Sequence, residues 1–350
     1  MEPFVSILIP AYNAHRWVAD TIRSALAQTW PRKEIIVIDD GSCDRTLEIA
    51  KQFASKNVFV VTQENQGASA ARNKAFDLCQ GDYIQWLDAD DILAPDKVEG
   101  QMQKVAQGLS GLTLLSSAWY RFYYRISAAK PAKTGLWQDL QPNEWAIRSM
   151  SSNAWMGIQS WLVSRELISA IGKWDETLSA DDDGEYVSRL ICASDRILFV
   201  SAAESYVRRS NPESLSKNPH SERKVVSQYR SMLLQIENWL RLDNSRAMRS
   251  ACVEDIQRWF IYFYPEYRTI VDQLRKLVHE LGGDLSVPTI GWKYRPVQRV
   301  LGWRPAKRLM HLAPQTRTWC TKTWDKLLFS LSNERAADVS RPSRDPSHLI

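Results

Sequence analysis

Short apolar runs and segments with helical spacing alternate along the N-terminal part of the chain. The apolar runs, rich in β-branched residues, lie at 5–10, 34–38, 57–61 and 83–87. Continuous runs of this kind are typical of strands that are buried on both faces, as in a parallel sheet. Between them, apolar residues recur with helical spacing at 17–26, 47–53 and 68–78. Strands that alternate with helices in this way predict right-handed βαβ units and an open α/β sheet.

Polar residues gather where these predicted strands end. The first run ends at Pro10-Ala11-Tyr12-Asn13, the second at Asp39-Asp40 and the fourth at Asp88-Ala89-Asp90-Asp91. In open α/β sheets, ligands bind outside the carboxyl ends of the strands. Carboxylates crowded at the end of a buried strand are costly unless they are neutralised, and a hard divalent cation shared with substrate phosphates is the usual partner. For the last stretch alone, a solvated acidic turn that caps the next helix is the alternative.

Residues 5 to about 216 resemble a family 2 glycosyltransferase of the GT-A fold. The resemblance rests on segments in a matching order, VSILIPAYNA, EIIVIDDGSCDRT, ENQGASAARNKAFDLCQGDYIQWLDADDILAPDK, GKWDETLSADDDGEYVSRL and YVRRSNPESLS. It implies a Rossmann-like, mostly parallel sheet flanked by helices. It also implies transfer of a sugar from a nucleotide-sugar, with a UDP-sugar favoured, to an acceptor hydroxyl with inversion at the anomeric carbon. The acceptor would be a carbohydrate or a lipid-linked molecule.

The resemblance also assigns residues to the metal ion and to part of the nucleotide-sugar donor. Asp90 matches the principal metal ligand of the family, and Asp88 matches the carboxylate that contacts the ribose or a metal-bound water. Because only oxygen ligands are offered, the expected ion is Mg²⁺ or Mn²⁺. Ala89, between the two carboxylates, is assigned to the nucleotide-sugar site with Asp88.

The nucleotide base is expected at the ends of the first two strands. Tyr12 could stack on the base, and the backbone of Pro10 and Ala11 could bond its edge. Of Asp39 and Asp40, the second is favoured by position to accept the imide proton of uracil. For Tyr12 the alternative is ordinary packing in the core.

The third helix would complete the donor site. Arg72 could reach the base or the diphosphate, and Gly67 permits close approach of the backbone. A salt bridge on the helix surface is the alternative for Arg72.

The catalytic base is expected in Ala180-Asp181-Asp182-Asp183-Gly184-Glu185. Counting back from Arg189 places Asp183 on the family's base and Asp182 on its acidic neighbour. Aspartate replaces the commoner glutamate and a third aspartate precedes, so the register can slip by one and Asp182 is the reserve. Crowded carboxylates raise one another's pKa, which suits a group that must accept a proton. An acidic first turn favoured by the helix dipole is the alternative.

A polar stretch after the predicted strand 197–200 carries Arg208 and Arg209. In relatives this region folds over the diphosphate as a loop, where basic residues would stabilise the leaving group. A solvated loop is the alternative. Asn153, Gln159 and Trp161 lie in the region where acceptors dock in the family, with no role assigned to any of the three.

The chain beyond the predicted catalytic domain, 1–220, falls into three parts. Helical spacing predicts a packing appendage over 221–290. Residues 291–330 hold nine Lys or Arg against one acid, Asp325, interleaved with Trp and Leu. A basic, Trp-rich segment of this kind, 291–332, is typical of an amphipathic helix on an anionic membrane. A solvated or oligomer-forming tail is the main alternative, and nucleic acid is not expected because no nucleic-acid fold is visible. The polar, Pro/Ser-rich residues 333–350 are predicted to be disordered.

Several features of the sequence indicate where in the cell the protein is located. No apolar run is long enough to cross a bilayer, and the sequence opens directly into the first predicted strand without a signal peptide. The five cysteines are odd in number and widely spaced, which indicates a reducing cytoplasm. We therefore expect a cytoplasmic protein, with peripheral attachment to the cytoplasmic face of the membrane as the alternative location.

Two rival functions stay open. A nucleotidyltransferase also uses a parallel sheet with acidic metal ligands, but it should show a Gly-rich basic loop after the first strand, where this chain has residues 10–15. The other rival is a non-catalytic nucleotide-sugar-binding partner of a synthase. The presence of Asp88, Asp90 and Asp183 weighs against it.

Overall fold

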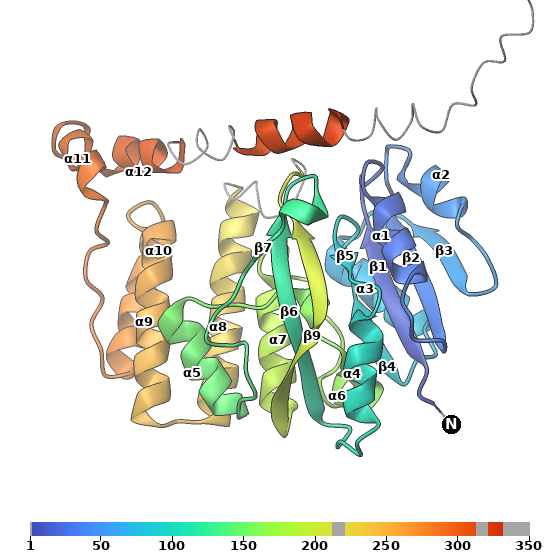
Figure 1. Cartoon of the computed structure of the whole chain (residues 1–350). Coiled ribbons are helices and arrows are strands. Elements are labelled where there is room, and N and C mark those ends of the chain that lie inside the picture. Colours follow the sequence, from blue (N-terminus) through green and yellow to red (C-terminus); the bar gives the residue numbers. More distant parts are fainter. Residues whose placement is uncertain (1, 212–220, 313–320, 332–350) are drawn as a thin grey trace, which may run out of the picture. The chain divides into compact units, whose positions relative to one another are not determined.

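The computed structural model describes residues 2–211, 221–312 and 321–331. The elements of this chain are labelled in Figure 1, and they fall into two compact units. The first unit comprises Met1–Arg121, Pro131–Val207 and Asn211–Pro288, and the second comprises Phe122–Lys130, Arg208–Ser210 and Thr289–Ile350.

A mostly parallel sheet in the first unit confirms the predicted α/β fold. Its strand order is β3-β2-β1-β4-β8. The strands are β1 (Val5–Ala11), β2 (Lys33–Asp40), β3 (Val58–Gln63), β4 (Tyr83–Trp86) and the short antiparallel β8 (Val163–Ser164). The predicted helices are α1 (Val18–Leu26), α2 (Thr46–Lys51) and α3 (Ala68–Leu78). All residues of β1 are buried, as expected for a central strand covered on both faces.

The register of the parallel strands brings the predicted polar residues to one edge. Ala11 at the end of β1 lies opposite Asp39 of β2, and Leu8 lies opposite Trp86, the last residue of β4. Parallel strands end on the same side of their sheet, so the polar residues that follow β1, β2 and β4 share this edge.

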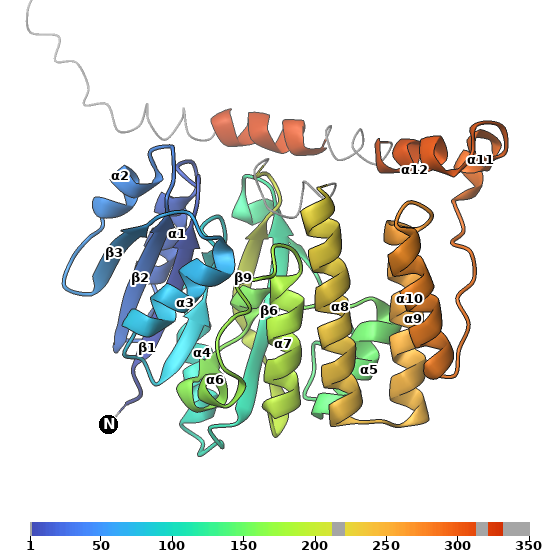
Figure 2. The ribbon, with the colours of Figure 1, turned by 180° about the vertical axis from the view of Figure 1, so that it is seen from behind.

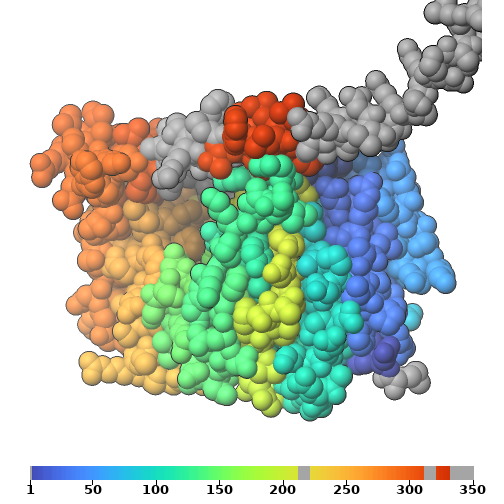
Figure 3. Space-filling view, viewed as in Figure 1, coloured from blue at the N-terminus to red at the C-terminus, as the bar shows by residue number. Residues whose placement is uncertain are grey.

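A second sheet with the order β5-β9-β6-β7 follows in the sequence. Its strands are β5 (Ile92–Leu93), β6 (Thr113–Phe122), β7 (Lys130–Pro131) and β9 (Arg196–Arg208). The side chains of β9 and β6 lie next to each other on one face (Figure 3). The expectation that the strand ends at Val200 is wrong, because pairing of β9 with β5 at Ile92 and Leu93 carries it to Arg208.

Helices flank the sheets and extend the first unit (Figure 2). They are α4 (Lys97–Val105), α5 (Pro142–Ser152), α6 (Arg165–Ile171), α7 (Asp182–Ala193), α8 (Glu222–Leu242), α9 (Arg246–Phe263) and α10 (Arg268–Glu280). The helical appendage predicted over 221–290 is therefore present as α8–α10. Its buried residues Met232, Ile256 and Leu274 join the core cluster that contains Trp86 and Leu8. These helices share one hydrophobic core with the sheet.

The second unit contains the basic, Trp-rich segment. Its helices are η4 (Trp292–Tyr294), α11 (Arg295–Leu301), α12 (Trp303–Leu312) and residues 321–331. Among all the helices that the structure describes, none is both long and apolar enough for a membrane crossing. The predicted disordered tail, 333–350, lies outside the described residues, and the cytoplasmic location stays a prediction.

Candidate active site

Arg72 on α3 connects the two acidic motifs that the sequence singled out. Its Nη2 donates to Asp88 Oδ1 at 2.9 Å, and its Nη1 donates to Asp182 Oδ2 at 2.8 Å. Asp183 Oδ1 lies 3.3 Å from the same Nη2. Arg72 is only 5% exposed, so the interpretation of a salt bridge on the helix surface is wrong. One buried guanidinium thus holds the turn after β4 beside the start of α7.

An aromatic platform supports this guanidinium. The Arg72 Cζ atom lies 4.3 Å from the centroid of the Trp174 ring, a cation–π distance. Trp174 stacks on Tyr186 of α7 with centroids 3.9 Å apart, and Trp86 meets Trp174 edge-on at 5.4 Å. Asn73, the next residue of α3, accepts from the Trp174 N–H and donates to its carbonyl oxygen. The aromatic ring of Trp174 and the surrounding carboxylates therefore fix the position of the Arg72 guanidinium.

The electrostatics of Arg72 follow from this environment. Burial alone would lower the pKa of Arg72, but the carboxylates of Asp183, Asp88 and Asp182 raise it above its ordinary value. The guanidinium is therefore a permanent positive charge, which is compensated inside the site.

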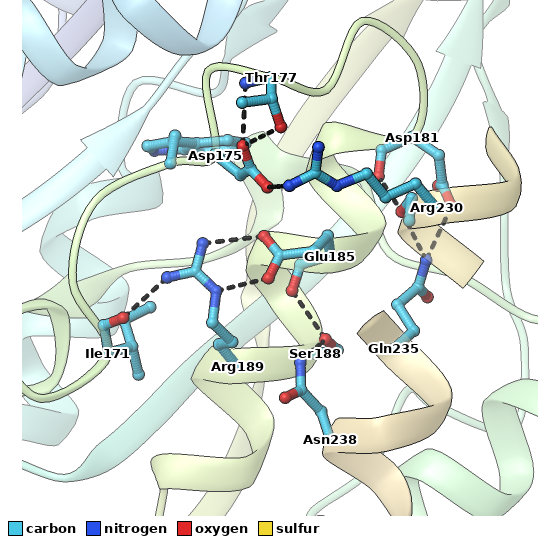
Figure 4. Close-up of polar contacts among 12 residues, drawn as sticks. Ile171, Asp175, Thr177, Asp181, Glu185, Ser188, Arg189, Arg230, Gln235 and Asn238 are labelled. Atoms are coloured by element: carbon cyan, nitrogen blue, oxygen red, sulfur yellow. Dashed lines mark hydrogen bonds and ion pairs between the residues drawn. The ribbon is translucent and has the colours of Figure 1, made fainter. Parts of the chain in front are cut away.

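The three consecutive aspartates at the start of α7 have different surroundings. Asp181 takes a left-handed backbone conformation with φ of 56° and precedes the helix as its N-cap. Its Oδ2 accepts from Gln228 at 2.9 Å and Ser231 at 3.1 Å, both on α8. It also accepts from Gln235 of the same helix at 2.7 Å (Figure 4). Burial raises the pKa of Asp181 to about 6, against the effect of these hydrogen bonds. Asp181 therefore anchors the turn to α8 and has little freedom to act on a substrate.

Asp183 is more open to solvent than its neighbour Asp182. Its side chain is 46% exposed, against 19% for Asp182. Its Oδ1 is buried and accepts no hydrogen bond. Burial of that oxygen and the like charges of Asp182, Asp88 and Asp181 raise the pKa of Asp183 to about 8, although Arg72 acts in the opposite direction. A carboxylate that is accessible and has a raised pKa has the properties of a general base.

Arg189, the landmark used to count back to Asp183, has a structural part in α7. Its Nε and Nη2 donate to the two oxygens of Glu185 at 2.7 and 2.8 Å, and its Nη1 donates to the Ile171 carbonyl oxygen at 2.7 Å (Figure 4). On the same helix, Ser188 Oγ accepts from Asn238 of α8. These contacts tie α7 to its neighbours and hold its first turn in place.

The predicted base-binding rim combines an exposed ring with a rigid backbone. Tyr12 is 48% exposed, so the interpretation as core packing is wrong. Asn13 has φ of 47°, its N–H donates to Ser42 Oγ, and its Oδ1 accepts from the Cys43 N–H. The backbone after β1 is thereby bound to the backbone after β2. Pro10 and Ala11, at the end of β1, are buried.

Asp39 and Asp40 differ in how many hydrogen bonds they accept. Asp40 Oδ1 accepts from Gln63 Nε2 and the Gln66 N–H, and its Oδ2 accepts from the Gly67 N–H at 2.8 Å. Asp39 Oδ2 accepts from Thr62 Oγ1 at 3.0 Å, whereas its buried Oδ1 accepts none. Asp40 therefore organises the loop before α3, and the acceptor left without a partner belongs to Asp39.

Gly67 serves this loop through its backbone conformation. It has φ of 98° at the N-cap of α3, a conformation that L side chains rarely adopt, and a Cβ atom there would meet nothing within 4 Å. A glycine is needed at this position because of its positive φ, and not because a side chain would be crowded.

The turn after β4 presents Asp88 and Asp90 around the buried Ala89. Asp90 Oδ2 accepts from Asn211 Nδ2 at 2.8 Å. The Asp91 N–H donates to the Asp88 carbonyl oxygen, and the Asp91 carbonyl oxygen accepts from Thr21 Oγ1, so Asp91 braces the turn. Within the described ranges, no group of three or more His, Cys, Asp or Glu could hold a metal ion. The protein's own metal ligands here would be Asp88 and Asp90.

Comparison with known proteins bears on this arrangement. Residues 6–130 match the family model for glycosyl transferase family 2. This part of the chain is thus similar to proteins of glycosyl transferase family 2. The putative teichuronic acid biosynthesis glycosyltransferase TuaG of Bacillus subtilis is 42% identical over 105 residues, which cover 29% of this chain and 42% of TuaG. Escherichia coli chondroitin synthase is 42% identical over 110 residues, 31% of this chain and 16% of the synthase. The chain thus spans less than half the length of these curated relatives.

Solved structures extend the likeness in fold beyond the family segment. The crystal structure of Staphylococcus aureus TarS residues 1–349 in complex with UDP-GlcNAc superposes with a TM-score of 0.63 and 18% identity. The match covers 79% of this chain and 80% of the TarS chain. Identity this low shows the fold alone, and it confirms the GT-A architecture expected from the sequence.

The glycosyltransferase fold leaves some predicted residues outside this cluster. Gln159 and Trp161, from the predicted acceptor region, are buried in the core. Arg208 ends β9 with its guanidinium 4.6 Å from the centroid of Phe122, and the Arg209 N–H donates to the Phe122 carbonyl. Both arginines belong to the second unit, and their role at the diphosphate stays a prediction.

Sequence reasoning missed Trp174 and Asn211, which contact Arg72 and Asp90. Both stand in segments that carry the family resemblance, GKWDETLS and YVRRSNPESLS, and this was the only available signal. Their side chains reach the site from distant positions in the chain, so no local pattern marks them.

Proposed function

We propose that this chain is an inverting glycosyltransferase that moves a sugar from a nucleotide-sugar, with UDP-sugars favoured, to an acceptor hydroxyl. The acceptor would belong to a polysaccharide, a glycolipid or a lipid-linked oligosaccharide. Two relatives support this class by name, one in teichuronic acid biosynthesis and one as chondroitin synthase. A structural neighbour, TarS, was crystallised with UDP-GlcNAc, which supports the choice of donor.

The observation that carries the proposal is the bridge from Arg72 to Asp88 and to Asp182 and Asp183. A transferase must place its base next to the bond that breaks in the donor. Here the carboxylate motif for the donor and the candidate base are held by the two nitrogens of one guanidinium.

The reaction would use Asp183 as the base. Its carboxylate takes the proton of the acceptor hydroxyl while that oxygen attacks the anomeric carbon from the side opposite the nucleotide. The new glycosidic bond forms as the bond between the anomeric carbon and the diphosphate oxygen breaks, and the nucleoside diphosphate leaves with the electron pair. Arg72 keeps Asp183 in position and contributes positive charge near the departing diphosphate.

A divalent cation fits the donor set of the turn after β4. Asp90 and Asp88 offer only carboxylate oxygens, the ligand chemistry that suits Mg²⁺ or Mn²⁺, and these two residues would hold the ion. When bound, such an ion would act as a Lewis acid on the leaving diphosphate.

Two assays test the proposal. A panel of nucleotide-sugars with and without Mn²⁺ should reveal one donor that is slowly hydrolysed, in a reaction that needs the metal. Asp183→Asn should bind that donor normally while transfer falls by about two or more orders of magnitude. Asp181→Asn is the neighbouring control and should retain at least part of the activity. Near-normal turnover by Asp183→Asn, or no binding of any nucleotide-sugar by the unaltered protein, would contradict the proposal.

A further inference from the structure

The helix formed by residues 321–331 packs with its polar side inward. Asp325 accepts from the N–H groups of Tyr124 and Arg125 at 2.9 and 3.2 Å and from Arg125 Nε at 2.7 Å. Lys322 Nζ donates to the Ser210 carbonyl oxygen at 2.8 Å. Lys322, Asp325 and Phe329 follow the i, i+3, i+7 spacing of one helix face, which we call the inner face.

Phe329 adds the apolar part of this inner face. Its ring centroid lies 6.1 Å from that of Tyr124. The guanidinium and the backbone N–H groups lower the pKa of Asp325, although its burial acts in the opposite direction. Asp325 is therefore ionised and fully engaged inside the second unit.

The outward side of the same helix is apolar. Trp324, Leu327 and Leu331, again spaced i, i+3, i+7, are 64%, 54% and 55% exposed. We call these residues the outer face. A helix of a soluble protein normally turns its apolar face to the core and its charged face to water. This helix instead buries the charged Asp325 and leaves the apolar stripe of the outer face in contact with solvent.

The charged residues of the segment 291–330 are also divided between the inside and the outside of the unit. Asp325 is the only acid among residues 291–330, against nine Lys and Arg, and it is buried against Arg125. The exposed charge of this segment is therefore entirely basic. Other helices of the unit also expose large apolar side chains, namely Trp292, Val300, Leu301 and Leu309.

We propose that the outer face of helix 321–331 inserts into the interfacial region of an anionic phospholipid membrane. Tryptophan and leucine on one face, with basic residues beside them, are the composition that holds a helix in a bilayer interface. The inner face keeps the helix attached to the rest of the second unit, so the enzyme would be anchored as a peripheral protein. A second copy of the chain is the less suitable occupant, because a symmetric contact would bring two basic surfaces together.

The test uses the full-length protein and sedimentation with vesicles of phosphatidylcholine, with and without phosphatidylglycerol. We expect binding to the anionic vesicles that weakens with added salt, since surface charges are screened. The variant Trp324→Ser/Leu327→Ser should bind at least about tenfold more weakly. The control Trp259→Ser/Phe59→Ser also removes two exposed aromatic side chains, both from the first unit, and should bind like the unaltered protein.

The readouts distinguish this proposal from its rivals and from the proposed function. Nucleotide-sugar hydrolysis in solution and the melting temperature should be the same in the outer-face variant and the unaltered protein, which shows that the catalytic unit is intact. Equal vesicle binding by the outer-face variant, or no preference for anionic vesicles, would overturn the proposal. A dimer in sedimentation velocity that the outer-face variant abolishes would assign this face to a second copy instead.

Discussion

Arg72 and Asp182 are 110 positions apart in the chain, yet their Nη1 and Oδ2 atoms are 2.8 Å apart. The same guanidinium also contacts Asp88 and Asp183, so its planar fork joins three carboxylates from two motifs. An arginine suits this position because several donors lie in a fixed plane, whereas a lysine offers a single point charge.

Two substitutions of Arg72 should distinguish its contribution to catalysis from its contribution to the stability of the fold. Arg72→Lys keeps one positive charge but cannot bridge three carboxylates, so we expect kcat/KM to fall by about two orders of magnitude with a modest loss of stability. Arg72→Met removes the shared partner of Asp88, Asp182 and Asp183, which are partly exposed, and should lower the free energy of unfolding by about 1–3 kcal/mol. The control is Arg45→Lys, whose partner Glu48 is on the surface, and it should change neither quantity. Full activity of Arg72→Lys would exclude the bridging role.

The raised pKa of Asp183 predicts the pH dependence of the reaction. A base must be deprotonated to act, so kcat/KM should rise with pH through the pKa of Asp183, about 8 in the free protein. Asp182→Asn removes a like charge, so the pKa of Asp183 should fall and the rising limb should move to lower pH. The exposed Asp77, paired with Lys173, provides the control Asp77→Asn, for which the limb should not move. An unmoved limb in Asp182→Asn would argue against Asp183 as the base.

The same pKa shift affects stability. The folded state holds the Asp183 proton more tightly than the unfolded chain, whose aspartates have a pKa of about 3.9. This contribution to stability is complete below that value and is lost as pH rises towards about 8. Asp183→Asn should therefore gain stability relative to the unaltered protein as pH increases across this window. Denaturant unfolding at both ends of the window measures the difference in the free energy of unfolding between the two proteins. A difference that does not change with pH would show that the carboxyl group of Asp183 does not titrate within this window.

Gly184 is expected to tolerate no side chain. A Cβ atom at this position would lie 2.5 Å from Asp181 Oδ1 and 2.9 Å from Gln235 Nε2, within the contacts that anchor the turn to α8. Gly184→Ala should cost about 1–3 kcal/mol of stability and reduce transfer by displacing Asp183. Gly135→Ala is a suitable control, because nothing lies within 4 Å of its Cβ position. Equal melting temperatures for the two variants would show that the turn adapts at no cost.

Asp39 and Asp40 should respond differently to substitution. Asp40→Asn replaces a carboxylate that accepts two backbone N–H groups, so it should lower the melting temperature by loosening the loop before α3. Asp39→Asn should leave the melting temperature nearly unchanged and weaken UDP binding by about tenfold, if its free oxygen accepts the imide proton of uracil. Calorimetry with UDP compares the two variants. Weaker binding by Asp40→Asn alone, with unchanged stability, would restore the assignment made from position in the sequence.

The sequence was sufficient for the parts of the molecule that local patterns govern. Apolar runs and helical spacing predicted β1–β4 and α1–α3, and the residues after the strands were expected at one edge of the sheet. These predictions are reliable because strand burial and helix amphipathicity depend on neighbouring residues and repeat with a short period. The strand β9 was predicted too short, because its continuation to Arg208 depends on pairing with β5, whose residues are far away in the sequence.

Tertiary structure alone separates side chains that look identical in the sequence. Three chemically identical neighbours, Asp181, Asp182 and Asp183, have different surroundings. Asp181 accepts hydrogen bonds from α8, Asp182 forms an ion pair with Arg72, and Asp183 is exposed to solvent. Asp39 and Asp40 are separated in the same way by the loop after β3. Hydrogen-bond partners, burial and pKa depend on groups brought together from distant positions by packing, and no pattern of adjacent residues contains that information.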